Sequence, residues 1–496
     1  MAVADAFAGM QGLNDVYPMS NERRIMVNTA VLSVSEAASQ LANFALMIAF
    51  ARTFGAKTLG YYSVAMAVGA VAAVFVSFGT QSMLIREFGR DSTCAPATLG
   101  VLIPMQTLLA AIAWLIACVV TGALIHDTAA IALVMAVCGY QILLCLTSLL
   151  LVPLQAKELM HWSAGGNLAH RLLILLIGLA VIRFGGSAAG VCMSQIVGVL
   201  CFIAFAWIQG SRRFGRPVLQ YAPAKALALF RKASPFFGVN ALSIIYGRGP
   251  LILLSALAAS HSVGLYAAAD RFMVAAALVS TVFNSAVYPT VVRVSRGLLS
   301  DARVLTARCL RILLVFSFPI AILVTIYADN IITLCFGSTY LGAATALQVL
   351  VWSLPIRGAQ GLLSSLLMAM DQQAGLARAR AAGLCAFFVL APAFILSLGY
   401  VGAAWAVLLC DTLQFALHWS LLRKKHADPP LANAVLAPGS AVALTAAVSA
   451  ALGHLHPPMR FIMLNLVLAA GMFAFGAIRT HDLLFFQTLI MPKRGT

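Results

Sequence analysis

Apolar residues run along the chain in long stretches, which short polar segments interrupt at fairly regular intervals. A helix needs roughly 20 mostly apolar residues to cross the hydrocarbon core of a bilayer, and such stretches recur from residue 28 to residue 478. The breaks at Arg183–Gly186 and at Gly399–Tyr400 are the shortest. Fourteen spans are predicted, at 28–50, 60–84, 97–121, 129–153, 168–184, 187–208, 236–258, 264–289, 309–328, 343–369, 380–398, 401–422, 432–453 and 460–478.

The composition also indicates a membrane protein. Hydrophobic residues make up 62% of the 496 residues and charged residues 9%, whereas a soluble domain carries about 25% charged residues. The longest polar segments are the N-terminal tail and the loop from Gly210 to Pro235, and neither is long enough to form a soluble domain. The ten cysteines are scattered, so we expect small core residues rather than disulfides or metal ligands. The predicted fold class is an all-α polytopic membrane protein.

The basic residues are distributed unevenly between the two ends of the predicted spans. If the tails and the even-numbered loops share one side, that side holds 25 of the 32 lysines and arginines, and the other side holds four. Short loops rich in Lys and Arg stay in the cytoplasm. Both termini are therefore predicted to be cytoplasmic, and the number of spans to be even. The basic rim should also attract anionic headgroups, which makes membrane lipids an expected partner.

Two faint sequence echoes suggest an internal repeat. Residues 60–62 and 264–266 each begin a long apolar helix, and residues 150–158 resemble residues 366–374. Two six-helix bundles related by an axis along the membrane normal would explain this order. A short amphipathic helix at 224–232 is expected on the cytoplasmic leaflet. The predicted parts are an N-terminal cytoplasmic tail at 1–27, a six-helix bundle at 28–208, a basic cytoplasmic loop at 209–235, a second six-helix bundle at 236–422, and two extra helices with a cytoplasmic tail at 423–496.

Three arginines lie inside predicted spans. Arg248 and Arg357 stand beside glycine and proline residues that loosen a helix, in YGRGP and LPIRGAQG, and Gln360 lies one turn from Arg357. A charge at membrane depth needs a partner or a water-filled cavity, and a guanidinium group matches phosphate oxygens. One interpretation is a cationic cavity for a phosphate-bearing substrate. The alternative pairs Arg271 or Arg248 with Asp270, Glu36 or Asp411 in structural salt bridges. For Arg271, one turn from a loop, a side chain that reaches the membrane surface is an equal alternative.

Polar residues of the first span share one helical face. They include Glu36 and Gln40, and an offset of 204 residues aligns Glu36 with Asn240 in the seventh span. This face either lines a central cavity or forms a polar interhelical seam that holds the two bundles together. Glu36, Asp270 and Asp411 lie inside spans, and a buried carboxylate can carry a proton or hold a sodium ion. These acids are candidates for ion coupling, with charge compensation for the arginines as the alternative.

The sequence contains no catalytic constellation. It has no Walker A sequence, no GxSxG, and no histidine and cysteine cluster with metal-ligand spacing. A nucleic-acid partner would need a basic groove with aromatic residues, which the pattern does not offer. We therefore expect a transporter rather than an enzyme, with no cofactor, no metal and no nucleic-acid partner.

Several segments of the chain resemble one family of transporters. They are AFARTFGAKTLGYYSVAMAV (49–68), LLVPLQAKELMHW (150–162), SPFFGVN before an arginine in mid-helix, VGLYAAADRF, and a helix that ends YPTVVR. Together they resemble the polysaccharide, or O-antigen, flippases of the Wzx type, in the MOP superfamily that also holds the MATE drug exporters and the lipid II flippases. The resemblance covers about residues 25–425. Many relatives carry an acid just after the arginine of the seventh span, whereas this chain has Gly249-Pro250.

The resemblance implies a fourteen-helix, V-shaped pair of six-helix bundles with a cationic central cavity. It implies that oligosaccharide linked to undecaprenyl pyrophosphate is moved from the cytoplasmic to the periplasmic leaflet of the bacterial inner membrane by alternating access, coupled to an ion gradient. A polysaccharide polymerase and other envelope-assembly proteins are possible partners. Arg248 and Arg357 would hold the pyrophosphate. The other substrate-binding candidates are Arg271, Glu36, Gln40, Asn240 and Gln360.

Three alternatives remain at this point. A cation-coupled exporter of small drugs, as in the MATE branch, would favour acids and aromatics in its cavity because its substrates are usually cationic. A flippase of the lipid II type would carry a related pyrophosphate lipid. A membrane scaffold in an envelope-assembly complex would transport nothing.

Overall fold

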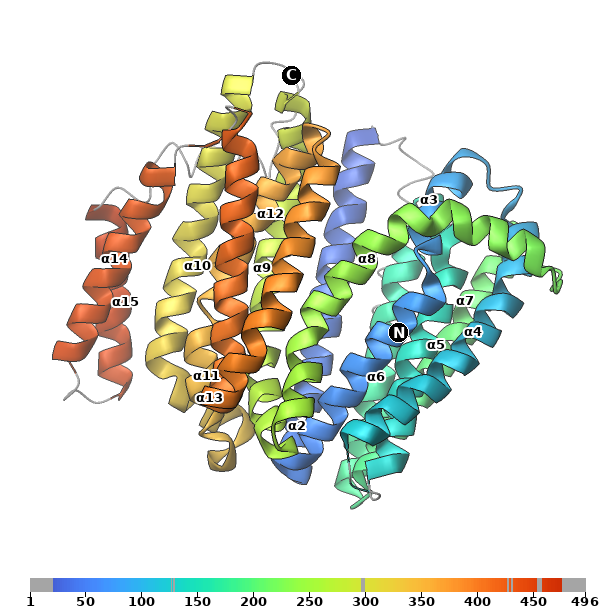
Figure 1. Cartoon of the computed structure of the whole chain (residues 1–496), viewed down its shortest axis with the longest axis horizontal. Coiled ribbons are helices and arrows are strands. Elements are labelled where there is room, and N and C mark those ends of the chain that lie inside the picture. The colour runs from blue at the N-terminus through green and yellow to red at the C-terminus, as the bar shows by residue number, and fades with distance from the viewer. Residues whose placement is uncertain are drawn as a thin grey trace. The chain divides into compact units, whose positions relative to one another are not determined.

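The computed structural model describes residues 21–474, apart from residues 126, 128–129, 296–298, 426–427, 430 and 453–456. The predicted N-terminal tail before residue 21 and the C-terminal tail after residue 474 lie outside the described residues. The described chain is all-α, as predicted (Figure 1). Its helices are α2 (Asn21–Ser77), α3 (Thr80–Arg90), α4 (Ala95–Leu124), α5 (Ile131–Ala156), α6 (Met160–Arg183), α7 (Ala188–Phe214), α8 (Pro223–Leu257), α9 (Ser260–Ser295), α10 (Leu299–Phe336), the 3-10 turn η2 (Ser338–Tyr340), α11 (Ala343–Leu350), α12 (Ser353–Ala369), α13 (Gln373–Arg423), α14 (Leu431–Ala451) and α15 (Pro457–Ala474).

The helices form two compact units, Met1–Ile252 and Leu253–Thr496. In the first unit α5 packs against α7 and α2, and α2 also packs against α4 and α6. In the second unit α12 packs against α9 and α13, and α10 packs against α14, which pairs with α15. The boundary between the units lies within α8, so this helix is their covalent connection. The predicted domain limits stay a prediction.

Two of the helices each contain two of the predicted spans. Helix α2 has 57 residues, about 85 Å of straight helix, which is more than twice the thickness of a hydrocarbon core. Its backbone leaves the helical region at Gly55, and the rings of Phe50 and Tyr62 are 5.5 Å apart across that break. Helix α13 breaks likewise at Gly399, which has a φ of 61°. Both breaks therefore separate two passes, as the sequence predicted.

Contacts between loops support the predicted alternation of the spans. At the Gly55 break, Lys57 Nζ lies 2.9 Å from Asp127 Oδ2 in the connection between α4 and α5. Spans one and two therefore turn at the same end of the unit as spans three and four. Lys232 Nζ in the first half of α8 lies 3.8 Å from Glu87 Oε1 in α3. The connector after span six thus shares an end with the connection after span two.

The prediction of one continuous second span, 60–84, is wrong, because the helix is interrupted before residue 80. Helix α2 ends at Ser77, and Phe78 and Gly79 both have positive φ, 45° and 72°, before α3 begins at Thr80. Helix α8 crosses at this point, because a Cβ at Gly79 would lie 2.6 Å from the backbone nitrogen of Phe237. The break therefore depends on a long-range contact as well as on glycine.

The predicted amphipathic helix at 224–232 and the seventh span are joined in one helix, α8, which includes the end of the predicted loop. Figure 1 shows it as one long, curved ribbon. Proline at position 235 cannot donate to the carbonyl of Arg231, but the hydroxyl of Ser234 donates to that carbonyl at 2.9 Å. The helix continues through the proline because this side chain satisfies the acceptor.

The predicted tenth span, 343–369, is also divided, into α11 and α12. The division lies at Val351 and Trp352. Because Pro355 lacks an N–H group, the carbonyl of Val351 accepts instead from the N–H of Leu354 at 3.0 Å, while Val351 and Trp352 keep right-handed helical angles. Arg357 therefore lies in the first turns of a separate helix.

Among the described residues, eight helices are long and apolar enough to cross a membrane, including both of the double-length helices α2 and α13. The protein is a multi-pass membrane protein.

Candidate functional site

The second unit contains an ion pair between two of the predicted site residues. Arg357, near the start of α12, donates from Nε to Asp411 Oδ2 at 2.7 Å. Asp411 belongs to the second pass of α13, and its side chain is 1% exposed, whereas that of Arg357 is 41% exposed. A buried carboxylate is costly without a partner, so Arg357 compensates Asp411 while part of its own side chain remains exposed.

Three more polar side chains surround this ion pair. Gln360, one turn after Arg357, donates from Nε2 to the backbone carbonyl of Asp411. Tyr266 of α9 is buried and lies within electrostatic range of Asp270, Arg357 and Asp411. Asp270, one turn further along α9, is partly buried. The chain thus brings charged and polar groups from α9, α12 and α13 to one place.

Close packing of α9 on α12 holds the helix that carries Arg357. A Cβ at Gly358 would lie 3.0 Å from Ser280 Oγ, and one at Gly361 would collide with the amide of Asn284. Asn284 Nδ2 also donates to the carbonyl of Gly358 at 3.5 Å. Ser280 and Asn284 therefore act in helix packing. Their place on α9 makes α12 a rigid platform for its guanidinium.

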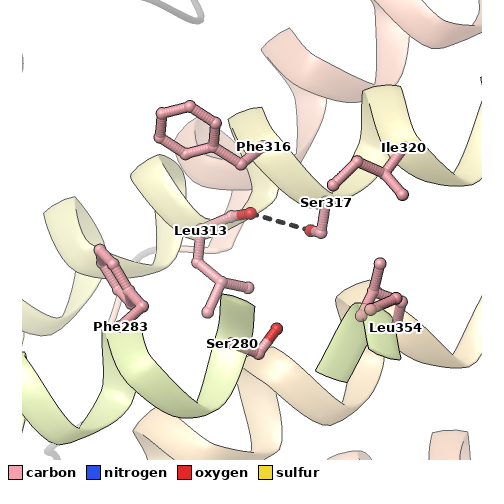
Figure 2. Close-up of a pocket in the computed structure, with 8 residues that line it drawn as sticks. Ser280, Phe283, Leu313, Phe316, Ser317, Ile320 and Leu354 are labelled. Atoms are coloured by element: carbon pink, nitrogen blue, oxygen red, sulfur yellow. Dashed lines mark hydrogen bonds between the residues drawn. The ribbon is translucent and has the colours of Figure 1, made fainter. Parts of the chain in front are cut away.

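A small cavity lies beside this packing contact. It has a volume of about 20 Å³ and is lined mainly by apolar side chains of α9, α10 and α12. Figure 2 shows Ser280 facing Leu313 and Leu354, and the Ser317 hydroxyl donating back to the Leu313 carbonyl. The cavity is too small for a lipid headgroup, so it is a packing gap rather than a substrate site.

In the first unit, the polar face of α2 meets α6. Ser35 donates to the carbonyl of Ala164 at 2.7 Å. Glu36 accepts hydrogen bonds from Gln40 at 2.8 Å and from Asn167 of α6 at 3.3 Å, and its side chain is exposed. The α2 face thus forms a polar seam with α6 inside the first unit, and it also presents an exposed carboxylate.

The sequence model of one protein family, described as polysaccharide biosynthesis protein, matches residues 25–295, more than half of the chain. The chain belongs to the polysaccharide biosynthesis protein family. No curated protein sequence matches it.

Solved structures of MOP superfamily transporters share the fold of this family member. The lipid II flippase MurJ in an inward closed conformation matches with a TM-score of 0.75 and 15% identity, over 92% of this chain and 100% of MurJ. An inward-facing MATE family multidrug resistance transporter gives 0.63 and 13%, over 78% and 94%. A MOP superfamily transporter from Pyrococcus furiosus Vc1, whose binding pocket is described as having reverse polarity, gives 0.59 and 10%, over 81% and 95%.

The other predicted site residues of this family member are distributed over both units. Arg271 is partly buried next to Asp270 in the second unit. Arg248 and Asn240 both lie on α8 in the first unit, where Arg248 is partly buried and Asn240 is exposed. Arg357 is therefore the in-span arginine whose surroundings the described contacts define best.

Sequence reasoning missed the buried tyrosines that accompany these charges. Tyr62 accepts a hydrogen bond from Gln195 of α7 at 2.8 Å, and Tyr140 accepts one from Arg171 of α6 at 2.6 Å. Tyr266 stands 204 residues after Tyr62 and is buried in the second unit as Tyr62 is in the first. The repeat offset was the available signal for this pair, but tyrosine in an apolar run is more often an ordinary core residue.

Proposed function

We propose that this member of the polysaccharide biosynthesis protein family is a flippase for a lipid-linked oligosaccharide. Its substrate would be a polysaccharide repeat unit on undecaprenyl pyrophosphate, moved from the cytoplasmic to the periplasmic leaflet by alternating access. Family membership supports the biosynthetic context. The structural observation that carries the proposal is the Arg357 side chain, 41% exposed, near the start of α12 inside a predicted membrane span.

The chemistry of a pyrophosphate lipid fits that guanidinium. A permanently charged group in a membrane span faces an aqueous pathway or a partner rather than lipid tails, because exposure to hydrocarbon is costly. Arg357 has a buried partner on one side and 41% of its side chain accessible. Phosphate oxygens are suitable acceptors for the accessible part. Arg248 and Arg271 are proposed to contribute further positive charge, and Gln40 and Asn240 to contact sugar hydroxyls.

The ion pair suggests how ion coupling would operate. Phosphate bound to Arg357 would compete with Asp411 for the same guanidinium. A buried carboxylate is costly when its cation no longer contacts it. A proton or sodium ion bound at Asp411 would then compensate its negative charge. Substrate binding at Arg357 and ion binding at Asp411 would then favour each other, and by linkage the coupling would be reciprocal. Asp270 and Glu36 are the remaining ion-coupling candidates.

The proposed location is the bacterial inner membrane with both termini in the cytoplasm. The distribution of basic residues over the loops supports this orientation. A polysaccharide polymerase and other envelope-assembly proteins are proposed as neighbours in the same biosynthetic process.

The test is lipid analysis of a strain depleted of the protein. Undecaprenyl-pyrophosphate-linked glycans are extracted, and the leaflet that holds them is determined. The strain is complemented with wild type, with Arg248→Ala plus Arg357→Ala, or with the control Arg212→Ala plus Arg423→Ala, which removes two exposed arginines outside the predicted spans. We expect the lipid-linked glycans to accumulate in the cytoplasmic leaflet of the depleted strain. Wild type and the control should relieve this accumulation, and the Arg248→Ala plus Arg357→Ala variant should not.

Two other outcomes would redirect the proposal. If depletion leaves every lipid-linked glycan unchanged but alters efflux of cationic drugs, the MATE-like exporter replaces the flippase. If the Arg248→Ala plus Arg357→Ala variant relieves accumulation as well as wild type, the protein still acts on the glycan, but these arginines are not its anion site.

A further inference from the structure

The first unit contains a groove at the start of the predicted span 97–121, lined by residues other than those of the Arg357 site. It has a volume of about 640 Å³, in the usual range for small-ligand sites. The start of α4, the segment between α7 and α8, and the first half of α8 form its walls. The lining side chains are those of Pro96, Ala97, Thr98, Val101, Arg216, Val218, Gln220, Lys225, Ala228, Leu229 and Lys232.

The first half of α8 is fixed in place by its buried face. Ala226, Phe230 and Ala233 pack into an apolar cluster with residues of α3, α4 and α5. Lys225 and Lys232, which line the groove, are exposed. The amphipathic pattern of this segment thus separates an anchoring face from a basic one.

The opposite wall is pinned to α4. The backbone N–H of Gln220 donates to the carbonyl of Gly100 at 2.9 Å. A Cβ at Gly100 would collide with the backbone of Val218, so glycine permits the segment to lie directly against the helix. The groove is therefore formed before any ligand binds.

Charge and exposed apolar surface occur together around the groove. Arg216, Lys225 and Lys232 are its three charged lining residues, and the nearby Glu87 offsets only the last of them, at 3.8 Å. Val218 is 69% exposed, and Leu219, Tyr221 and Leu227 are also exposed. Basic groups beside exposed apolar side chains are typical of segments that lie at a membrane surface.

We propose that this groove binds the phosphate headgroup of an anionic phospholipid from the leaflet that surrounds it, with the exposed apolar side chains against the adjoining acyl chains. In the proposed orientation this is the cytoplasmic leaflet, and the inference rests on that orientation. The positive charge of the groove complements an anionic headgroup, and its apolar lining complements a glycerol backbone and the first methylenes. The lipid would brace the first half of α8, the helix that connects the two units.

The test measures lipid binding without transport. Full-length protein in neutral detergent is titrated with phosphatidylglycerol or phosphatidylcholine, and bound lipid is counted by native mass spectrometry. The groove variant is Arg216→Gln, Lys225→Gln and Lys232→Gln. The control, Arg212→Gln, Arg231→Gln and Lys424→Gln, removes the same charge from exposed residues that do not line the groove.

We expect wild type and the control to bind phosphatidylglycerol at least about tenfold more tightly than the groove variant does, since each basic residue near an anionic surface contributes appreciably. A charge-conserving variant, Arg216→Lys, Lys225→Arg and Lys232→Arg, should retain binding. That result would show that the segment still folds with all three positions substituted. Equal losses in the groove variant and the control would mean non-specific adsorption and would overturn the site.

Two further results would also overturn the inference. One is binding of phosphatidylcholine as tight as that of phosphatidylglycerol. The other is a marked preference for a pyrophosphate lipid over phosphatidylglycerol, which would make the groove a substrate site. Because the readout is phospholipid binding, failure here leaves the glycan-accumulation test untouched. Failure of that test in turn leaves this binding measurement valid.

Discussion

The Arg357–Asp411 pair predicts an asymmetry between its two single mutants. At about 4 Å between charge centres and an effective dielectric of about 20, the gross attraction is about 4 kcal/mol, and burial of Asp411 offsets several kcal/mol of this. Arg357→Gln removes this guanidinium from a carboxylate that is 1% exposed. We therefore expect a loss of about 3 kcal/mol in the free energy of unfolding, the lower end for breaking a buried pair.

The reverse change, Asp411→Asn, should cost less, about 1 kcal/mol, the typical value for a single hydrogen bond. Arg357 is 41% exposed, so its charge can be hydrated. The double mutant removes both charges and should be more stable than Arg357→Gln alone. The single-mutant effects should therefore fail to add, with a coupling of about 2 kcal/mol.

The assay is denaturant unfolding of each variant in the same mixed micelles. Arg378→Gln, an exposed arginine at the start of α13, serves as the control and should change stability by less than about 0.5 kcal/mol. If Asp411→Asn destabilises as much as Arg357→Gln, or if the two effects simply add, the carboxylate is not dependent on this arginine and the reasoning from burial is refuted.

Three further substitutions test helix packing inside the two units. Gly79→Ala should lower thermal stability and expression, because its φ of 72° and the backbone of Phe237 at 2.6 Å both exclude a Cβ; an unchanged melting temperature would contradict this crossing of α8. Tyr62→Phe should cost about 1–3 kcal/mol in unfolding experiments by leaving the buried amide of Gln195 without its acceptor, whereas a neutral effect would mean that water replaces the hydroxyl. Gly402→Ala should disturb the turn between the passes of α13, where the preceding pass fills the Cβ position, and protease protection of that turn should fall.

The fold class and the succession of apolar passes follow from the sequence alone. Apolar length and loop charge are local properties, and each span must satisfy its own backbone hydrogen bonds in lipid. The breaks at Gly55 and Gly399 were therefore readable from the positions at which apolar runs end. Arg357, Gln360 and Asp411 were also singled out from the sequence, because charged and polar groups in apolar runs are expensive.

Which of these groups meet depends on the tertiary packing of the helices. Arg357 and Asp411 are 54 positions apart in the sequence. The connection from α12 to α13 and the break at Gly399 both lie between them, and no spacing rule relates side chains across such a distance. The continuity of α8 through Pro235 likewise depends on one hydroxyl, and the break at Gly79 depends on a helix from far along the chain. Sequence patterns report the burial of each helix face in lipid or protein, whereas the pairing of charges depends on how the helices pack.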